Sequence, residues 1–223
     1  MKILILDSGP IINLSMNSLL YIFEKLKSKD MEIIITPSVK TEVVDYPLRI
    51  KRFELGALRA QQLIERGIIC LPEKIGITAE SLSQETKKVL SVINSTLKTD
   101  GEYIRIVSEA ESSCLALSKI LSDRKIENII AIDERTTRTL FEKPENLESL
   151  MSKKLHRKVK IANNDFRKLG NFRFIRSPEI VFVAHKKNLT NLKGNRALEA
   201  LLYATKYKGS SISDEEIKSI KKL

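Results

Sequence analysis

The sequence predicts an α/β fold, a twisted parallel sheet flanked by helices on both faces, and three observations support this prediction. Short uninterrupted apolar runs at residues 3–6, 33–35 and 129–132 are typical of strands buried on both faces. Stretches with helical spacing of apolar residues separate these runs, as the crossovers of a parallel sheet require. The hydrophobic content of 42% in 223 residues is sufficient for one sizeable core with an appendage.

The first strand, residues 3–6, ends on the carboxylate of Asp7. Ser8 can cap the helix that follows, and Pro10 suits a first helical turn because its missing N–H leaves no bond unmade. Asp7 is therefore expected at the carboxyl end of a strand, the edge at which open α/β sheets bind ligands. The alternative is that Asp7 only caps the helix, and this stretch alone favours neither interpretation.

The later elements follow from the same two patterns, apolar runs for strands and apolar residues three or four apart for helices. We expect further strands at residues 33–35, 68–71, 129–132 and 172–175. We expect helices at residues 10–28, 48–66, 79–97, 108–121, 134–141, 145–156, 178–187, 194–207 and 213–222, and another beginning after residues 36–38. Residues 103–107 fit neither pattern, and the polar, basic stretch 158–171 is expected to be partly irregular.

The formal charge of +11 is concentrated in the last third of the chain. Residues 1–142 hold 20 Lys or Arg and 20 Asp or Glu, whereas residues 143–223 hold 19 and 8. This division predicts a neutral catalytic domain, 1–142, and a basic helical extension, 143–223, which adds the last strand and packs on the same domain. A basic flank favours a polyanion partner such as RNA or DNA, although Lys-rich composition also serves solubility. The low aromatic content, without Trp, argues against base stacking as the main mode of contact.

Cysteine usage and hydropathy indicate a cytoplasmic protein. Cys70 and Cys114, the only cysteines, lie in apolar surroundings and are expected to be buried free thiols. Neither belongs to a Cys-x-x-Cys or Cys/His pattern, so a structural zinc is not expected. The apolar run at the N-terminus is too short for a signal peptide, no stretch reaches membrane-spanning length, and no membrane partner is expected.

Acidic residues recur where the predicted elements meet one edge of the sheet. Asp7 and Asp133 each end an apolar strand, and Glu42 shares a helix face with Val39 and Val43, which predicts that it points inward. A fourth acid is supplied by a helix start, where Ser108 and Glu111 form a Ser-x-x-Glu capping box.

A cluster of carboxylates at a sheet edge repels itself unless cations fill it, and hard oxygen ligands suit Mg²⁺ or Mn²⁺. Such a site can activate water for attack at phosphorus by a two-metal mechanism. The choice between Glu109 and Glu111, and between Asp133 and Glu134, stays open. We favour Glu111, one turn before Leu115 on an inward face, and Asp133, which ends the strand directly.

Four stretches resemble the PIN-domain nucleases, a family that includes the VapC-type toxin ribonucleases. Residues 5–14 (Ile-Leu-Asp-Ser-Gly-Pro-Ile-Ile-Asn-Leu) resemble the family's opening strand and helix, and residues 36–43 resemble its Pro-x-Val motif with the following glutamate. Residues 108–117 resemble a Gly-Glu-Ala-Glu helix start with Ser in place of Gly, and residues 132–138 resemble the closing acidic pair with its downstream arginine. The order and spacing fit over residues 1–140.

The resemblance implies a metal-dependent endoribonuclease. Asp7, Glu42, Glu111 and Asp133 would be catalytic, and the metal would be held by Asp7, Glu111 and Asp133 together with Glu109. Ser8 would touch a metal-bound water and Asn13 would orient Asp7, although polar packing explains Asn13 equally well. Glu134 and Arg138 would support the site, unless Glu134 is only a solvated charge at a helix start and Arg138 only pairs with acids.

The resemblance implies that residues 141–171 are an insertion relative to the family. We expect this insertion to extend the RNA-facing surface. Its basic residues are Lys153, Lys154, Arg157, Lys158, Lys160, Arg167 and Lys168. A solvated basic excursion without a partner is the alternative. The resemblance also admits an antitoxin or an RNA-processing partner, and a homodimer.

Other functions stay open beside the nuclease. A PIN-like module that binds RNA in a larger assembly, with weak or no catalysis, would carry the same basic surface. A receiver-like signalling domain is disfavoured, because receivers place two adjacent acids after the first strand and Ser8 follows Asp7 here. A haloacid-type phosphatase is disfavoured because Gly9 stands where its second aspartate is needed.

Overall fold

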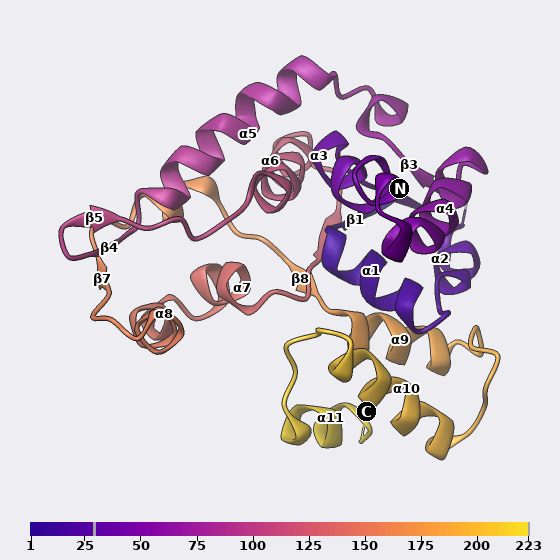
Figure 1. Cartoon of the computed structure of the whole chain (residues 1–223). Helices are drawn as coiled ribbons and strands as arrows, with labels where there is room; N and C mark the ends of the chain where they lie inside the picture. The colour runs from indigo at the N-terminus through magenta and orange to yellow at the C-terminus, as the bar shows by residue number, and fades with distance from the viewer. Residues whose placement is uncertain (29, 223) are drawn as a thin grey trace.

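A computed structural model describes residues 1–28 and 30–222 of the chain. Its centre is a five-stranded sheet in the order β3-β2-β1-β6-β8, in which every neighbouring pair is parallel (Figure 1). The strands are β1 (Lys2–Leu6), β2 (Met31–Ile34), β3 (Ile69–Cys70), β6 (Asn128–Ala131) and β8 (Phe174–Ile175). The expected α/β fold with a parallel sheet is confirmed, and the opening strand lies at its middle.

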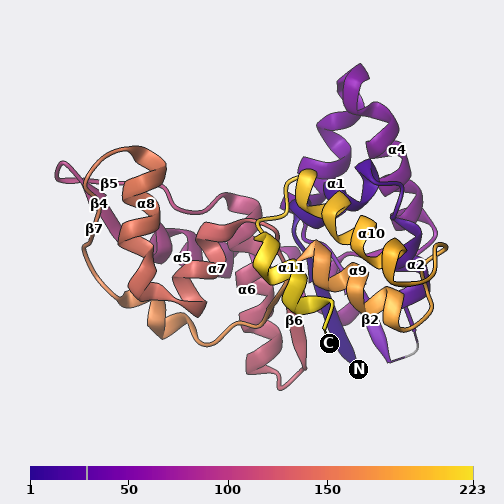
Figure 2. The same ribbon diagram turned by 90° about the horizontal axis from the view of Figure 1, so that it is seen from below.

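Helices cover both faces of this sheet. They are α1 (Ser8–Met16), α2 (Tyr21–Leu26), α3 (Pro37–Lys40), α4 (Lys51–Glu65), α5 (Ala79–Asn94), α6 (Glu109–Asp123), α7 (Arg135–Glu142), α8 (Leu147–Leu155), α9 (Ser177–Lys186), α10 (Asn195–Tyr207) and α11 (Asp214–Ile220). Helix α6 packs on β1 and β6 from one face, and α5 lies outside it. Helices α1, α2 and α9 pack together on the opposite face (Figures 1 and 2).

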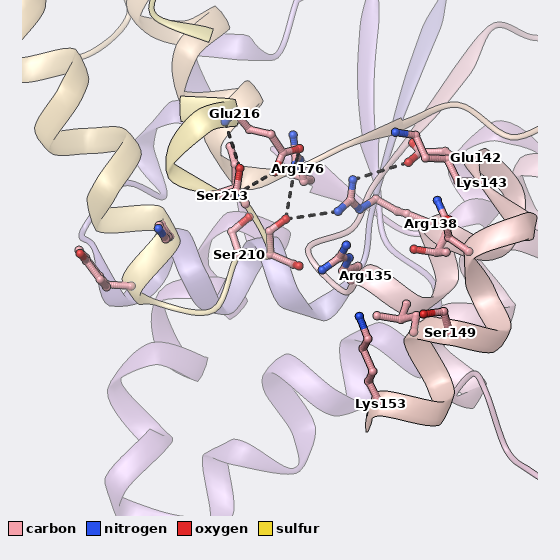
Figure 3. Close-up of a pocket in the computed structure, with 17 residues that line it drawn as sticks. Arg135, Arg138, Glu142, Lys143, Ser149, Lys153, Arg176, Ser210, Ser213 and Glu216 are labelled. Atoms are coloured by element: carbon pink, nitrogen blue, oxygen red, sulfur yellow. Dashed lines mark hydrogen bonds and ion pairs between the residues drawn. The ribbon is translucent and has the colours of Figure 1, made fainter. Parts of the chain in front are cut away.

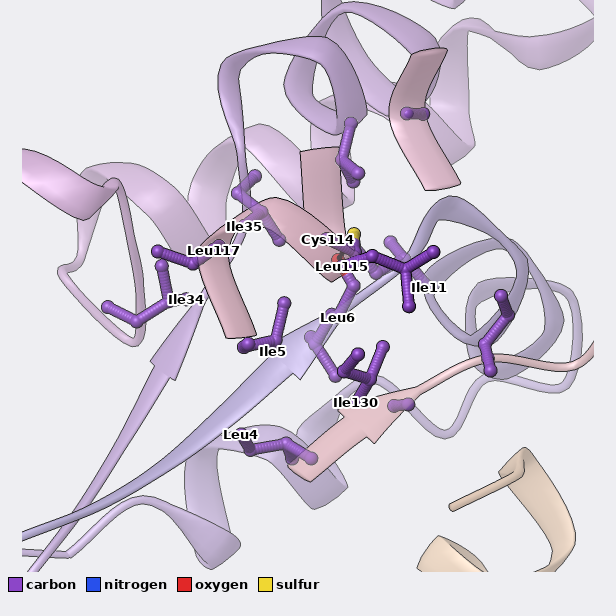
Figure 4. Close-up of a cluster of buried hydrophobic side chains, with 14 of the residues drawn as sticks. Leu4, Ile5, Leu6, Ile11, Ile34, Ile35, Cys114, Leu115, Leu117 and Ile130 are labelled. Carbon is purple, nitrogen blue, oxygen red and sulfur yellow. Dashed lines mark hydrogen bonds between the residues drawn. The ribbon is translucent and has the colours of Figure 1, made fainter. Parts of the chain in front are cut away.

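The core is built on β1, whose residues 3–6 are buried on both faces of the sheet. Leu4 is in register with Ile33 of β2 and with Ile129 of β6. Figure 4 shows side chains of β1 and α6, with Leu6 close to Leu115 and Cys114. A strand without a polar face is stable only between two helical layers, so the apolar run of the sequence fixes β1 at the centre of the sheet.

A second, small sheet lies away from the main one. It joins β4 (Leu97–Thr99) in antiparallel fashion to β5 (Glu102–Tyr103) and to β7 (Lys160–Ile161). It follows the end of α5 and lies beside α8 (Figure 1). The undecided stretch 103–107 thus begins in a strand and continues as irregular chain, and the basic stretch 158–171 holds one short strand and a 3-10 helix, Asp165–Leu169.

The C-terminal third contributes to the main sheet and adds a helical layer beside α1. Its strand β8 pairs with β6, where Phe174 is in register with Ile130. Helix α9 packs on α1 and α2, and α10 packs on α9. A separate apolar cluster joins α10 to α11 through Leu198, Leu202, Ile212, Ile217 and Ile220.

Two helix predictions need correction. The helix expected at residues 10–28 is two helices, because Asn17 bonds back to the carbonyl of Asn13 and Ser18 takes a left-handed conformation with φ of 56°. Asn and Ser side chains compete with the helix ladder in this way. After α3 the chain continues as a π-helical turn, Thr41–Asp45, and then as a 3-10 turn, Pro47–Arg49, before α4 begins.

Both cysteines are free and buried, as expected. Within residues 1–28 and 30–222 no helix has the length and apolar character needed to cross a membrane.

Candidate functional site

The candidate site lies at the carboxyl edge of the central strands. Asp7 follows β1 directly and forms the N-cap of α1, while Asp133 and Glu134 follow β6, the neighbour of β1. The two chain segments touch, because the backbone N–H of Asp7 donates to the carbonyl of Ala131 at 3.0 Å. The parallel pairing of β1 with β6 therefore carries three acids to one edge.

Asp7 is the most perturbed acid of this edge. Its side chain is only 4% exposed, and its Oδ2 accepts one long bond, 3.5 Å, from the backbone N–H of Gly9. Its Oδ1 is buried and has no hydrogen-bond partner in the part of the chain that the structure describes. Burial, followed by the negative charge of Glu111, raises the pKa of Asp7 to about 7; a smaller contribution comes from Glu42. Asp7 is thus both a helix cap and a buried carboxyl group with an unused oxygen.

Glu111 is held in place by both of its oxygens. Oε2 accepts the backbone N–H of Ser108 at 2.7 Å, which completes the predicted capping box of α6. Oε1 accepts the hydroxyl of Thr137 at 3.1 Å. Burial is the largest cause of a raised pKa for Glu111, and the nearby charge of Glu134 adds to it. The capping role alone does not account for Glu111, since its second oxygen faces α7.

Glu134 lies next to Glu111 and shares a partner with it. It is the N-cap of α7, and its Oε2 accepts the backbone N–H of Thr137 at 2.8 Å. Its Oε1 accepts the hydroxyl of Thr136 at 2.6 Å and pairs with Lys154 at 3.3 Å. Thr137 therefore fixes Glu111 with its hydroxyl and Glu134 with its amide, so the two carboxylates lie on either side of one residue.

Asp133 has a different environment from the one expected. Ser177 donates its backbone N–H to Oδ1 at 2.8 Å and its hydroxyl to Oδ2 at 2.6 Å. Ser210 donates its hydroxyl to Oδ1 at 2.8 Å, and Asn13 donates to Oδ2 at 3.4 Å. A carboxylate offers about four lone-pair positions, and these bonds use all of them. Of the two acids after β6, Glu134 acts on Glu111, and Asp133 lies close to Asp7, since a Cβ on Gly9 would contact both side chains.

Asn13 does not orient Asp7. Its amide donates to the carbonyl of Thr205 at 2.8 Å as well as to Asp133, so it joins α1 to α10. The polar packing role is the one that the structure supports. Ser8 is the first residue of α1 rather than its cap, and its backbone N–H lowers the pKa of Asp7.

The prediction that Glu42 points inward is wrong. The π-helical turn Thr41–Asp45 adds a residue to the helical repeat, so Val43 and Val44 are buried and Glu42 is exposed. Its charge nevertheless acts on Asp7. Glu42 therefore lies at the solvent-facing rim of the acidic edge.

Glu109 is separated from Glu111 although only one residue intervenes. It is exposed and lines a cavity of about 460 Å³ between α3, α5 and α6, together with Ser38, Thr86 and Ser113. Two residues along a helix differ by about 200° in direction, which explains why the two glutamates face different surroundings.

The pKa of the Cys114 thiol is affected by three of the predicted acids. Its thiol lies under β1, 3.7 Å from the carbonyl of Leu6. Burial raises the pKa of this thiol, and the negative charges of Asp7, Glu111 and Glu42 raise it further. The charges of three carboxylates distant in sequence thus act on one buried side chain.

The acids do not form a closed metal cage. Among residues 1–28 and 30–222, no group of three or more His, Cys, Asp or Glu side chains is arranged to hold a metal ion. Mg²⁺ usually keeps several waters and is bound through one or two carboxylates. The fit of a cation therefore depends on pairs of acids, of which Asp7, with its unused buried oxygen, is the central member.

A basic cavity of about 890 Å³ lies beyond Glu134, between α7, α8 and the segment 206–216 (Figure 3). Arg138 lines it, donates to the carbonyl of Ser211 at 3.3 Å and pairs loosely with Glu142 at 3.7 Å. Lys153 lines it as well, the one residue of the predicted RNA-binding set that does.

The rest of that basic set is spread over the surface around α8 and β7. Lys154 pairs with Glu134, Arg157 with Asp100 at 3.8 Å, Lys160 with Glu148 at 3.4 Å and Lys168 with Asp165 at 2.7 Å; Arg167 stacks on Phe166, and Lys158 is exposed. Exposed pairs of this kind contribute little to stability, about 0 to 1 kcal/mol each, so they leave the cations available to other anions.

Sequence reasoning missed Thr137, Ser177 and Ser210, the residues that hold the acids. Thr137 carried a signal, because Glu at an N-cap accepts the amide three residues on. No local sequence pattern marked Ser177 and Ser210, because they lie 44 and 77 residues from Asp133, the residue they contact.

Searches of protein-family models, of curated proteins and of solved structures give no significant match to this chain or its fold.

Proposed function

We propose that the protein is a metal-dependent endoribonuclease that hydrolyses phosphodiester bonds of single-stranded or structured RNA. The observation that carries the proposal is Asp7, a buried carboxyl group with an unpartnered oxygen and a pKa of about 7, at the carboxyl edge of a parallel sheet beside Glu111 and Glu42. Strongly perturbed acids at such an edge favour a catalytic or metal-binding role. The four stretches that resemble PIN-domain nucleases support the same function.

The donor chemistry fits Mg²⁺ or Mn²⁺. Asp7 Oδ1 would be a direct ligand, and Glu111 with Glu42 or Glu134 would act directly or through water, because their carboxylates are hard oxygen donors. Asp133 is left out of this set because its lone pairs are used. The bound cation supplies activation of a water and stabilisation of charge at the leaving oxygen.

The chain's own residues hold these groups in fixed positions. Ser108 and Thr137 orient Glu111, and Thr136 with Thr137 orient Glu134, so neither carboxylate needs to reorganise during the reaction. Glu42, which is exposed at the rim, would accept the proton that water loses on attacking phosphorus. The leaving oxygen is protonated from solvent as the P–O bond breaks.

Lys154 and Lys153 link the acids to the phosphate-binding surface. Lys154 lies 3.3 Å from Glu134, and Lys153 opens onto the neighbouring cavity. Neutralising phosphates with such residues releases counterions and makes affinity fall steeply with salt. The basic excess of residues 143–223 supports RNA as the substrate class.

The test is cleavage of a fluorescent single-stranded RNA in Mn²⁺, with and without EDTA. We expect cleavage that EDTA abolishes and that Asp7→Asn or Glu111→Gln reduces by about 10²-fold or more. Glu109→Gln is the matched control, since it removes the same charge from the same helix turn but faces another cavity. Equal activity of wild type and Asp7→Asn, or cleavage that persists in EDTA, would contradict the proposal.

The second candidate is an RNA-binding module with weak or no catalysis. It is favoured by the lack, among the described residues, of three acids arranged to hold an ion. This candidate predicts salt-dependent RNA binding that is unchanged by EDTA and by Asp7→Asn, with no cleavage in Mn²⁺.

A further inference from the structure

A cavity distinct from the acidic edge has six cationic and two acidic side chains among its seventeen lining residues. Its volume is about 890 Å³, and its walls are α7 and α8 on one side and the segment between α10 and α11 on the other. Figure 3 shows Arg135 and Lys153 pointing into the space that faces Ser210. Helix α7 connects the two sites, with Glu134 at its start and Arg138 one turn later.

Arg138 is the least satisfied group of this cavity. Its side chain is 12% exposed, and its Nε is buried without a hydrogen-bond partner in the part of the chain that the structure describes. Its remaining contacts are the 3.3 Å bond to Ser211 and the loose pair with Glu142. Burial, and then the neighbouring Arg176, lower the pKa of Arg138. A buried cationic N–H without a partner costs free energy unless a bound group supplies an acceptor, and an anion is the strongest acceptor.

The other cations of the cavity divide into compensated and uncompensated groups. Arg176 is compensated, since it pairs with Glu179 and with Glu216 at 2.8 Å. Lys206 is paired with Asp214 at 2.7 Å. Arg135, Lys143 and Lys153 have no acidic side chain within 4.0 Å among the residues that the structure describes. Three cations and Arg138 thus share a single cavity with little negative charge.

We propose that this cavity is a binding site for a phosphomonoester, with the phosphate at Arg138 and within reach of Lys143 and Lys153. A phosphomonoester carries close to two negative charges at pH 7, and arginine forks bind phosphate through paired N–H donors. The volume falls in the range that accommodates a nucleotide. Tyr207, at one edge of the cavity and 76% exposed, offers a face on which a base can stack.

Two kinds of ligand carry a phosphomonoester: a free nucleoside monophosphate and the 5′-phosphorylated end of a nucleic-acid strand. The site goes beyond the proposed cleavage reaction, because binding needs no metal and uses none of the acids of the sheet edge. It is therefore tested in EDTA, where its outcome is independent of whether the protein cleaves RNA.

The experiment measures the affinity of four probes for the full chain: adenosine 5′-monophosphate, adenosine, and a short RNA with either a 5′-phosphate or a 5′-hydroxyl. We expect the phosphorylated member of at least one pair to bind about tenfold more tightly. A preference in the mononucleotide pair assigns the free nucleotide, and a preference confined to the RNA pair assigns the strand end. Equal affinity within both pairs overturns the proposal.

Variants of the lining residues test whether the preference for phosphorylated probes arises in this cavity. Arg138→Gln should abolish it, and thermal unfolding checks that this partly buried change leaves the protein folded. The double variant Lys143→Gln/Lys153→Gln, at exposed positions, should weaken it about tenfold. Its control, Arg52→Gln/Arg59→Gln on α4, removes two charges from exposed positions outside the cavity. A preference that survives the cavity variants, or that the control removes equally, overturns the assignment.

Discussion

Ser177 donates both its backbone N–H and its hydroxyl to the carboxylate of Asp133, at 2.8 and 2.6 Å. With the bonds from Ser210 and Asn13, this carboxylate joins the end of β6 to the start of α9, to the second half of α1 and to the segment before α11. Asp133, which the sequence suggested as a metal ligand, thus connects distant parts of the chain through hydrogen bonds.

Replacing Asp133 should therefore cost stability. We expect Asp133→Ala to lower the free energy of unfolding by about 2–4 kcal/mol, because buried donors of Ser177 and Ser210 lose their acceptor. Urea unfolding at pH 7 measures this loss. Ser177→Ala, which removes one of the four bonds, should cost about 1 kcal/mol. A fully stable Asp133→Ala protein without RNA cleavage would instead assign Asp133 to the chemistry.

Asp7 should make stability depend on pH between about 4 and 7. Its folded-state pKa, about 7, lies above the unfolded value of 3.8, so the folded state holds the proton more tightly. The stability that this proton contributes is complete below pH 4 and is lost as pH rises through 7, by at most about 4 kcal/mol.

Asp7→Asn should flatten this part of the stability curve, measured by urea unfolding in EDTA from pH 4 to pH 8. A slope remains from Glu111, whose raised pKa acts in the same direction. Parallel curves for the two proteins would show that Asp7 does not titrate in this range.

Cation binding should release protons. At pH 7 Asp7 is about half protonated, and a bound Mn²⁺ requires the carboxylate, so we expect release of about half a proton per ion from this group. Calorimetric titration in two buffers of different ionisation enthalpy measures the number. Asp7→Asn should bind Mn²⁺ more weakly and without this proton. Unchanged binding by that variant would remove Asp7 from the ligand set.

Thr137 should couple Glu111 to Glu134. Thr137→Val keeps the backbone N–H that Glu134 accepts but removes the hydroxyl that Glu111 accepts. We expect the pKa of Glu111 to rise further, because that hydroxyl lowers it, and stability to fall by about 1 kcal/mol. Carboxyl-carbon NMR titration of wild type and variant measures the shift. Thr136→Val, which removes a hydroxyl bonded to Glu134 and Lys154 but not to Glu111, is the matched control.

The sequence predicted those parts of the fold that depend on local pattern. The apolar run of β1 and the cap at Ser108 are decided by neighbouring residues, so both could be inferred before the structure. The site residues Asp7 and Glu111 came from the same signals, since each follows a recognisable element. The structure adds that their charges, with that of Glu42, act together on the pKa of the buried Cys114 thiol.

The errors share a different cause, which is that tertiary contacts override periodicity. Glu42 faces solvent because a π-helical turn shifts the helical repeat by one residue. The bonds that Asp133 accepts from Ser177 and Ser210 could not be predicted either, because these residues lie 44 and 77 positions away in the chain. The small antiparallel sheet escaped notice because β5 and β7 have two residues each, too few to show alternation.

The contact of Asn13 with Thr205 spans 192 residues, and that of Ser210 with Asp133 spans 77. Strand β1 is synthesised long before α10 and the segment after it, and these two contacts form only when that later part of the chain is available. Contacts of such long range slow folding, since loop closure must precede them. These two contacts therefore form late. A ribosome-bound chain that stops before residue 205 lacks both of them, whereas the bonds of Ser177 to Asp133 need no residue beyond 177.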